Sequence, residues 1–450
     1  MTNNVLEQYE KGRLNLEGTL GHLTFKESAL LQVFWRKLLE AFTSDASKLA
    51  DAPTAPADTA AKSTSTKRSA RAGKSHTSGK DSKESSSNSG GGWFGFGGSS
   101  KREEPLSYRQ TVGDIAPAES NPPLFPTQNN ARTIRDAFWA ATLCDHPDVL
   151  LLRFLRARKW NVDDALQMLL ACLRWRLDEE LDWIIWTGES SLNYSLIQRG
   201  IGYMHKTDRL GQPVLYIPVR AIDPSAQPQE QMIEYTIYLM EVARIMLHPP
   251  AEKVCLVFDT TDMSMSNMDW TYFKTFLHYL EHYYPECLGL VLIYNASWVF
   301  YSLWKLISPM LDPVVASKVH FASSTADLQK FIAPQDLPRA YGGKSTFEYT
   351  YVLPKPNENS VMQDEAARLA AVADRSAACE KLEAVTRKWA GVPSTVPETP
   401  APADGNALAD ERNAAADALV ASSRALDKYV RARTLYHRTG IIDHDLNIHW

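Results

Sequence analysis

Four cationic side chains fall within the seven-residue run RFLRARK at positions 153–159. They are Arg153, Arg156, Arg158 and Lys159. Each arginine presents a planar fork of N–H donors that matches a phosphate or a carboxylate, so the run could bind an anionic group. Runs of this kind are more often a solvated helix face. The pattern alone favours the solvated face over an anion site.

One acidic and one basic residue each stand just before a short apolar run further along the chain. Glu286 precedes LGLVLIYN, and Lys318 precedes VHF. Strand ends of a parallel sheet are where ligand-binding groups tend to gather. A carboxylate there can accept hydrogen bonds from a polyol, and an ammonium can bind a phosphate. The simpler alternative is that the two residues pair with each other, and the pattern alone favours that pair.

Sequence patterns typical of catalysis do not occur in the chain. The run GGKS at 342–345 has Pro338 where a phosphate loop needs its first glycine. The sequence has no GxSxG elbow and no HExxH or CxxC pattern. His278 and His282 are four residues apart but lack a third ligand nearby. We therefore expect no catalytic residue, no metal and no cofactor, which argues against an enzyme.

The segment WVFYSLWKLISPML, residues 298–311, is apolar all round and has Lys305 as its one charge. Two interpretations are about equally well supported by this pattern. A helix that is apolar all round is typical of a protein core. The alternative is a lid whose outer face meets lipid.

Short apolar runs alternate with helix-length segments from residue 202 onward. Amphipathic segments separate the runs, and the unit closes at LPRAYGG near residue 343. A rhythm of strand, helix and strand predicts an α/β fold with a mostly parallel sheet. We expect four buried strands, at 213–219, 253–259, 288–295 and about 318–321.

Helices are predicted on both sides of this unit. Thr24 and Glu27 can form a capping box, Pro147 fits the first position of a helix, and Asn161 caps the next helix. The stretches expected to be helical outside the unit are 20–42, 361–390 and 407–437.

Composition is ordinary for a globular protein, with 44% hydrophobic and 22% charged residues. The formal net charge of -5 argues against a nucleic-acid-binding protein. The sequence shows no signal peptide and no run of the ~20 apolar residues that a spanning helix needs. Its five scattered cysteines fit reduced thiols in the cytosol.

A Ser- and Gly-rich tract interrupts the chain at 51–104 and cannot bury enough apolar surface to fold alone. From Lys62 to Arg102 it carries nine Lys or Arg and two Asp or Glu, together with the run GGGWFGFGG. Such a tract could attach weakly to anionic membranes. A plain flexible linker is an equally good interpretation.

Six segments occur in a characteristic order between about residues 130 and 345. They are LLRFLRARKWNVDDAL, YMHKTDRLGQPVLYIPV, VFDTTDMSMSN, YYPECLGLVLIYNA, LDPVVASKVHF and LPRAYGG. Together they resemble the CRAL-TRIO family of lipid-binding proteins, specifically its fungal phosphatidylinositol-transfer branch. The resemblance implies a helical N-terminal subdomain and a mostly parallel sheet lobe, whose apolar lipid cavity is closed by a gate helix.

Composition and resemblance together predict five parts, with helical extensions at both ends. These are an N-terminal helical segment at 1–50, a disordered basic linker at 51–128, the helical subdomain at 129–192, the lipid-binding lobe at 193–345 and a C-terminal helical extension at 346–450.

The resemblance implies roles for individual residues. In phosphatidylinositol-binding relatives the headgroup is held by residues that match Arg158, Lys159, Glu286 and Lys318. A threonine near the inositol phosphate of relatives is Val315 here. The segment 298–311 matches the gate helix, through Trp298, Phe300, Tyr301, Leu303, Trp304, Ile307, Met310 and Leu311.

A second ligand site is implied at Met204, Leu215, Ser264 and Ser266. Relatives carry tyrosines at the first two positions and use them to hold a phosphocholine head. Methionine and leucine there predict a more apolar wall, which disfavours phosphatidylcholine. A sterol, a polyprenoid or another neutral lipid fits that wall better.

The sequence therefore predicts a phosphatidylinositol-binding protein that exchanges this lipid with a second hydrophobic ligand between membranes, or presents it to a lipid kinase. We expect it in the cytoplasm, transiently and peripherally associated with intracellular membranes. One alternative is a lipid-regulated adaptor that acts through its tails. A lipid-modifying enzyme is less well supported, because no nucleophile or metal pattern is present.

Overall fold

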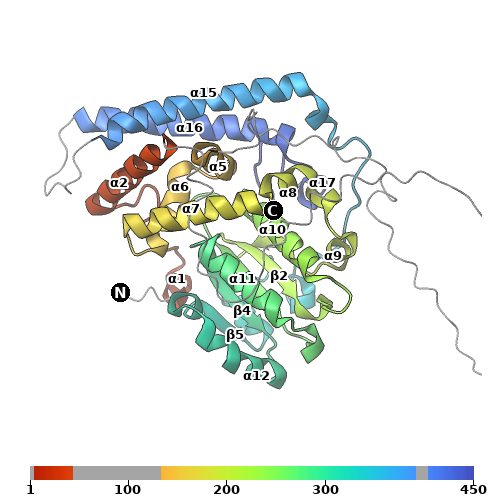
Figure 1. Cartoon of the computed structure of the whole chain (residues 1–450). Helices are drawn as coiled ribbons and strands as arrows, with labels where there is room; N and C mark the ends of the chain where they lie inside the picture. Colours follow the sequence, from red (N-terminus) through yellow and green to blue (C-terminus); the bar gives the residue numbers. More distant parts are fainter. Residues whose placement is uncertain (1–4, 44–132, 392–403) are drawn as a thin grey trace, which may run out of the picture.

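The computed structural model describes residues 5–43, 133–391 and 404–450 (Figure 1). The predicted linker at 51–128, with its basic tract, lies outside these residues. The α-helices are α1 (Val5–Lys11), α2 (Phe25–Phe42), α5 (Ile134–Ala141), α6 (Pro147–Ala157), α7 (Val162–Asp178), α8 (Leu181–Thr187), α9 (Tyr194–Arg199), α10 (Gln229–Ile245), α11 (Trp270–His282), α12 (Trp298–Ile307), α13 (Pro313–Ala316), α14 (Thr325–Gln329), α15 (Glu365–Ala390), α16 (Asp404–Val430) and α17 (Leu435–Arg438).

A five-stranded sheet lies at the centre of the lobe, in the order β1-β2-β3-β4-β5. Its strands are β1 (Tyr203–Thr207), β2 (Pro213–Pro218), β3 (Val254–Asp259), β4 (Leu288–Tyr294) and β5 (Val319–Ala322). β1 runs antiparallel to β2, and β2 to β5 are mutually parallel. This arrangement confirms the predicted α/β fold with a mostly parallel sheet.

The four predicted strands are confirmed, each to within one residue at either end. The first strand of the sheet was not predicted. Its sequence YMHKT carries His205 and Lys206 next to each other, which breaks the alternation of apolar and polar residues that marks a half-buried strand. The helix predicted at 407–437 is also too long, because α16 ends at Val430.

Predicted helix starts in the N-terminal half are confirmed in detail. Thr24 and Glu27 form a capping box at α2. Pro147 occupies the first turn of α6, where His146 is the N-cap. Asn161 caps α7 by accepting from the backbone N–H groups of Asp163 and Asp164.

Helices cover both faces of the sheet, so its strands are buried on both sides. Alternate residues Leu215 and Leu256 point to the face that carries α10 and α11, while Val214 and Val257 belong to the opposite core. α1 and α14 pack on that opposite core through Val5 and Leu328, among other residues. None of the described helices combines the length and hydropathy needed to cross a bilayer.

The helices α2, α15 and α16 belong to one core with the helical subdomain. α15 and α16 lie side by side across α2 and α5 (Figure 1), and Phe34, Phe138, Leu173, Leu382 and Leu419 share a single buried cluster. The terminal extensions and the subdomain therefore form one folded unit.

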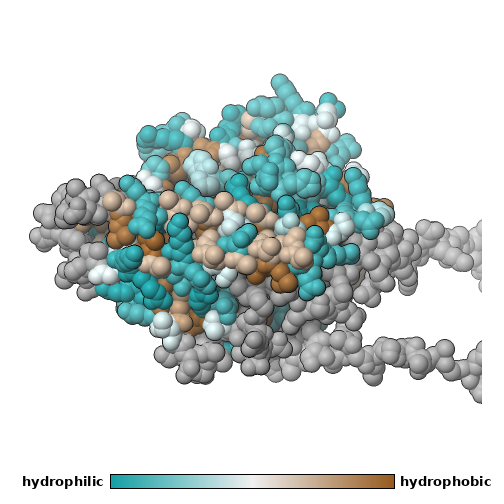
Figure 2. All heavy atoms as spheres, turned by 90° about the horizontal axis from the view of Figure 1, so that it is seen from above, coloured by the Kyte–Doolittle hydropathy of each residue, from teal (hydrophilic) through white to brown (hydrophobic). Residues whose placement is uncertain are grey.

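The outer surface of the α15–α16 pair carries small residues. Ala370, Ala373 and Ala377 are exposed on α15, and Ala418 and Ala421 are exposed on α16. From above, they form an apolar band bordered by hydrophilic side chains (Figure 2). Most of the larger apolar side chains of both helices are buried, among them Leu382 and Leu419, although Leu369 is exposed. These buried residues explain why Ala-rich helices still pack firmly on the subdomain.

A buried charge network ties these helices together. Arg412 of α16 donates to both carboxylate oxygens of Asp148 at 2.7 and 2.6 Å, and to the hydroxyl of Thr386 at 3.0 Å. The indole N–H of Trp35 donates to the same carboxylate at 2.6 Å. Burial opposes the ionisation of Asp148, but Arg412 outweighs this effect and holds its pKa below the ordinary value.

Arg412→Met is expected to lower the free energy of unfolding by about 3–5 kcal/mol, because it leaves the Asp148 carboxylate buried without its cation. Chemical denaturation followed by circular dichroism measures this change. The matched control is Arg387→Met at an exposed position of α15, for which we expect a change within about 0.5 kcal/mol. Equal effects of the two substitutions would show that α16 is not held by this network.

Candidate functional site

An apolar cavity of about 90 Å³ lies between the sheet and the helices α10 and α11. α10 lines it with one face, because its lining residues recur every three or four positions from Met232 to Arg244, and Leu247 just beyond the helix continues this wall. α11 contributes Tyr272, Phe276 and Leu280, each one helical turn from the next. The amphipathic pattern of both segments thus serves to build the cavity wall.

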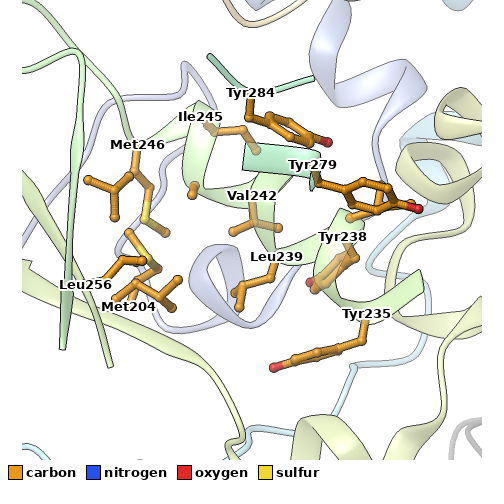
Figure 3. Packing of buried hydrophobic residues seen from close by; sticks show 14 of the residues in the cluster. Met204, Tyr235, Tyr238, Leu239, Val242, Ile245, Met246, Leu256, Tyr279 and Tyr284 are labelled. Carbon is orange, nitrogen blue, oxygen red and sulfur yellow. The ribbon is translucent and has the colours of Figure 1, made fainter. Parts of the chain in front are cut away.

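The sheet supplies the opposite wall through alternate residues. Leu215 and Ile217 of β2 and Val254 and Leu256 of β3 face the cavity. Met204 is paired with Leu215 across β1 and β2 and is buried in the same core, where Figure 3 shows it beside Leu256. Met204 and Leu215, two of the residues predicted for the second-ligand site, therefore form part of an apolar region.

The cavity is smaller than the roughly 300–1,000 Å³ of typical ligand pockets. A ligand with long hydrocarbon chains therefore requires its walls to separate. In α11, which forms one of these walls, Thr275 and Tyr279 are buried and most of the other side chains are half-buried.

A row of charged residues stands at the amino edge of the sheet. Lys253, Glu286 and Lys318 lie just before β3, β4 and β5. The chain enters the cavity wall directly after the first two of them, at Val254 and Cys287. The ammonium of Lys253 is 3.5 Å from the carboxylate of Glu286. A charged site thus adjoins one end of the apolar cavity.

Lys318 is the most unusual member of this row. Its residue surface is only 8% exposed, and among the described residues no carboxylate lies within 4 Å of its ammonium. Burial lowers the pKa of Lys318 below the ordinary lysine value, although Glu286 opposes this shift. A buried cation without a direct partner is costly, so the site is suited to an anionic group of a ligand.

Glu286 is the negative charge that complements the lysines of this row. Burial opposes its ionisation, but Lys318, Lys253 and Arg156 together hold its pKa below the ordinary value. Its backbone adopts φ of 56°, in the left-handed region that is uncommon for residues other than glycine. Lys159, another predicted headgroup residue, has φ of 49°. Backbone strain of this kind is concentrated at functional sites.

The RFLRARK run is divided between two environments. Arg153 is buried and Arg156 is half-buried, with its guanidinium 3.2 Å from Glu252 and 2.6 Å from the carbonyl oxygen of Gly18. The solvated-face interpretation is wrong for these two residues, because their side chains point into the junction between subdomain and lobe. Arg158 is half-buried and Lys159 is exposed, so both remain accessible to a ligand.

Sequence reasoning missed Lys253 and named Arg156 only as one cation of the RFLRARK run, although both residues lower the pKa of Glu286. A signal for Lys253 was present, because it precedes a predicted strand in the same way as Glu286 and Lys318. Arg156 could not be distinguished from its neighbours, since helical spacing alone does not say which cation faces the lobe.

The remaining predicted second-ligand residues lie elsewhere. Ser264 and Ser266 are exposed, and their hydroxyls are 2.7 Å apart. Ser264 also caps the short turn Met265–Asn267. Neither serine belongs to the lining of the cavity, whereas Leu215 does.

The segment 298–311 forms α12 and a following short 3-10 turn, Ser308–Met310. Phe300, Leu303 and Ile307 are buried, and Trp304 packs edge-on against Phe321 of β5 with ring centres 5.5 Å apart. The fully buried interpretation of this helix is therefore wrong, because its other face is open. Of the residues predicted to form a gate, those on or beside the open face are Trp298, Tyr301, Met310 and the half-buried Leu311.

Comparison with known proteins gives consistent matches. Residues 197–343 match the family model described as CRAL/TRIO domain, and residues 103–171 match that described as CRAL/TRIO, N-terminal domain. A CRAL-TRIO domain-containing protein of Schizosaccharomyces pombe is 36% identical over 319 residues, which cover 69% of this chain and 69% of the relative.

Two further relatives carry functional names. Phosphatidylinositol transfer protein CSR1 of Eremothecium gossypii is 31% identical over 314 residues, covering 68% of this chain and 70% of the relative. SEC14 cytosolic factor of Candida glabrata is 30% identical over 215 residues, covering 44% and 71%. Among solved structures, the crystal structure of Sfh5 aligns with 49% of this chain and 81% of that chain, at 20% identity and a TM-score of 0.40.

Lys318→Met is expected to raise the free energy of unfolding of the ligand-free protein by about 1 kcal/mol, because it removes a buried cation that has no direct partner. Arg176→Met is the matched control, since Arg176 is also 8% exposed but donates to both oxygens of Glu241. That variant should lose about 3–5 kcal/mol. Thermal unfolding compares the two, and a comparable loss in Lys318→Met would make Lys318 a structural residue.

Proposed function

The chain belongs to the CRAL-TRIO family, and we propose that it binds phosphatidylinositol and exchanges it with a second hydrophobic ligand between membranes. The observation that carries this proposal is the charged row at the amino edge of the sheet, directly beside the apolar cavity. A relative of 31% identity is a named phosphatidylinositol transfer protein, which supports the same lipid.

In this proposal the lipid headgroup lies at the charged row and the acyl chains lie in the apolar cavity. Lys318, together with Arg158 and Lys159, binds the phosphodiester through charge-assisted hydrogen bonds. Glu286 accepts from the ring hydroxyls of inositol. The acyl chains enter the cavity past Val254 and Cys287, where apolar side chains begin immediately after the charges.

Protein-mediated exchange has a clear physical purpose. A diacyl lipid carries on the order of 30 methylenes, each worth ~0.8 kcal/mol when it is kept from water. Unaided desorption from a bilayer therefore faces a barrier of roughly 20 kcal/mol or more. A dry cavity that opens against the bilayer removes most of this barrier, so exchange requires neither fuel nor a catalytic residue.

We assign the membrane-facing gate to α12 and the turn that follows it. Trp298 is 79% exposed and Leu306 is 61% exposed, although both are large apolar residues. Their burial in a bilayer would be favourable and would pull α12 away from Phe321. In this proposal the protein works in the cytoplasm, as the name of the SEC14 cytosolic relative suggests, and touches intracellular membranes transiently.

Presentation of phosphatidylinositol to a lipid kinase is the second part of the proposal, because the headgroup residues lie at an edge of the sheet and not deep within the lobe. The adaptor alternative predicts that the tails act independently of the lipid site. The shared core of α15, α16 and the subdomain works against that independence.

The double variant Lys159→Ala/Lys318→Ala tests the headgroup assignment. Transfer of phosphatidylinositol between vesicles should fall by about 100-fold or more, because each lost charged hydrogen bond costs roughly 1.5–3 kcal/mol and 1.4 kcal/mol corresponds to a factor of ten. Transfer of a neutral lipid should change little, since such a ligand contacts neither lysine.

Circular dichroism controls for folding of this double variant. As a reciprocal control, Leu215→Asn places a polar group on the cavity wall and should impair the neutral lipid. A folded double variant that transfers phosphatidylinositol at the wild-type rate would show that the headgroup lies elsewhere.

Alkaline pH should weaken phosphatidylinositol binding through Lys318. Because burial lowers its pKa, the ammonium loses its proton below the ordinary lysine value of roughly 10.4, whereas the bound phosphodiester stabilises the protonated form. Binding is thus full below the lowered pKa and declines as the pH rises through it. Vesicle binding measured from pH 7 to 10.5 should show this decline in the wild type, and Lys318→Arg should abolish it. The same decline in Lys318→Arg would assign it to another group.

A further inference from the structure

The cavity wall is not wholly apolar, and the donors of its polar side chains are already used in hydrogen bonds within the protein. Besides the weakly donating thiol of Cys287, the side chains with N–H or O–H groups on the wall are Tyr235, Thr236, Arg244, Tyr272 and Tyr284. Which of their hydrogen-bonding capacities remain free decides what polar group a ligand can bring into the cavity.

Two of the phenols already donate to protein oxygens. The hydroxyl of Tyr235 donates to the carbonyl oxygen of Gly202 at 2.9 Å, and the hydroxyl of Tyr284 donates to Glu241 at 2.9 Å. Figure 3 shows both tyrosines in the buried cluster around α10. A phenol has one proton, so each of these groups retains only the ability to accept.

The N–H donors of Arg244 are also used in hydrogen bonds within the protein. Its Nε and Nη2 donate to Asp145 at 3.2 and 2.6 Å, and Nη2 also donates to the carbonyl oxygen of Ala141 at 2.6 Å. Its Nη1 donates to both oxygens of Glu241 at 3.0 and 2.9 Å. These contacts account for all five N–H donors of a guanidinium, so the arginine on the wall has none to offer a ligand.

Thr236 and Tyr272 form a directed chain. The hydroxyl of Thr236 donates to the carbonyl oxygen of Met232 at 2.7 Å, and the oxygens of Thr236 and Tyr272 are 2.6 Å apart. Because the threonine proton is used on Met232, the proton between the two hydroxyls comes from Tyr272. A hydroxyl that donates in such a chain becomes a better acceptor, so Tyr272 ends the chain with a strengthened acceptor.

We propose that the second ligand is a neutral lipid whose polar group, where it has one, is a hydroxyl that donates to Tyr272. The cavity wall offers acceptors and no free strong side-chain donor, so an ester, a ketone or a phosphocholine head would enter with its acceptors unpaired. The inference rests on the proposed exchange of two lipids and deepens it by naming the chemical class of the second one.

A matched series of sterols tests this proposal. The full-length protein is incubated with phosphatidylcholine vesicles that contain phosphatidylinositol and equal amounts of cholestane, cholestanol and cholestanone, which share one skeleton. After re-isolation, bound lipids are quantified by mass spectrometry. We expect cholestane and cholestanol each to exceed cholestanone by about tenfold or more, because the ketone leaves an acceptor unpaired.

Two variants separate recognition from partitioning out of the vesicle. Tyr272→Phe removes the terminal acceptor and should lower the recovery of cholestanol relative to cholestane, with no loss of cholestanone. Tyr429→Phe, at a half-buried phenol of α16 that does not line the cavity, should leave every ratio unchanged. Each ratio is compared between variants that were incubated with the same vesicles. Differences between the sterols in their affinity for the bilayer therefore cancel.

Recovery of cholestanone at or above the level of the other two sterols would overturn the proposal. Recovery of phosphatidylinositol without any of the three sterols would also overturn it. An unchanged cholestanol-to-cholestane ratio in Tyr272→Phe would contradict the role of that residue. Failure to recover phosphatidylinositol itself would instead contradict the proposed function, so the two failures are distinguishable.

Discussion

The buried ion pairs of Arg244 are the interaction on which the rest of the structure depends. This side chain joins Asp145 before α6 to Glu241 of α10, and Glu241 in turn pairs with Arg176 of α7 at 2.9 Å. Burial opposes the ionisation of Glu241, but Arg176 and Arg244 hold its pKa well below the ordinary value. The network therefore stays charged, and it fixes the helical subdomain against the wall of the lipid cavity.

The contact between the helical subdomain and the cavity wall explains how one site could hold both a charged headgroup and hydrocarbon chains. The subdomain brings Arg156 close to Glu286, at the edge of the sheet where Lys318 also stands. On the cavity side, the ion pairs of Arg244 use all of its donors, so a charged residue lines an apolar space without attracting a polar ligand. In the proposed complex, the charged groups of the lipid would be held at the edge, and only its hydrocarbon chains would enter the cavity.

Much of the fold could be predicted because local signals and tertiary packing agree. The parallel strands carry continuous apolar runs, and α2, α6 and α7 begin at clear caps. The antiparallel strand β1 escaped prediction because His205 and Lys206 interrupt its pattern. The sequence also could not show that α15 and α16 share a core with α2, since the Asp148–Arg412 pair joins residues 264 positions apart. For the site, the pattern alone favoured a pair between Glu286 and Lys318, and only the resemblance implied a headgroup role for them. The partners of Arg153 and Arg156, and the hydrogen bonds that use the donors on the cavity wall, became visible only in three dimensions.

The central claim is that a charged edge and an apolar cavity hold one phosphatidylinositol molecule. Native mass spectrometry of the full-length protein purified from a fungal host, followed by identification of the released lipid, tests it most directly. The account predicts one lipid per protein molecule, with phosphatidylinositol far above its share of the host membranes and phosphatidylcholine far below. A protein that carries no lipid, or one whose lipids mirror the composition of the host membranes, would contradict it.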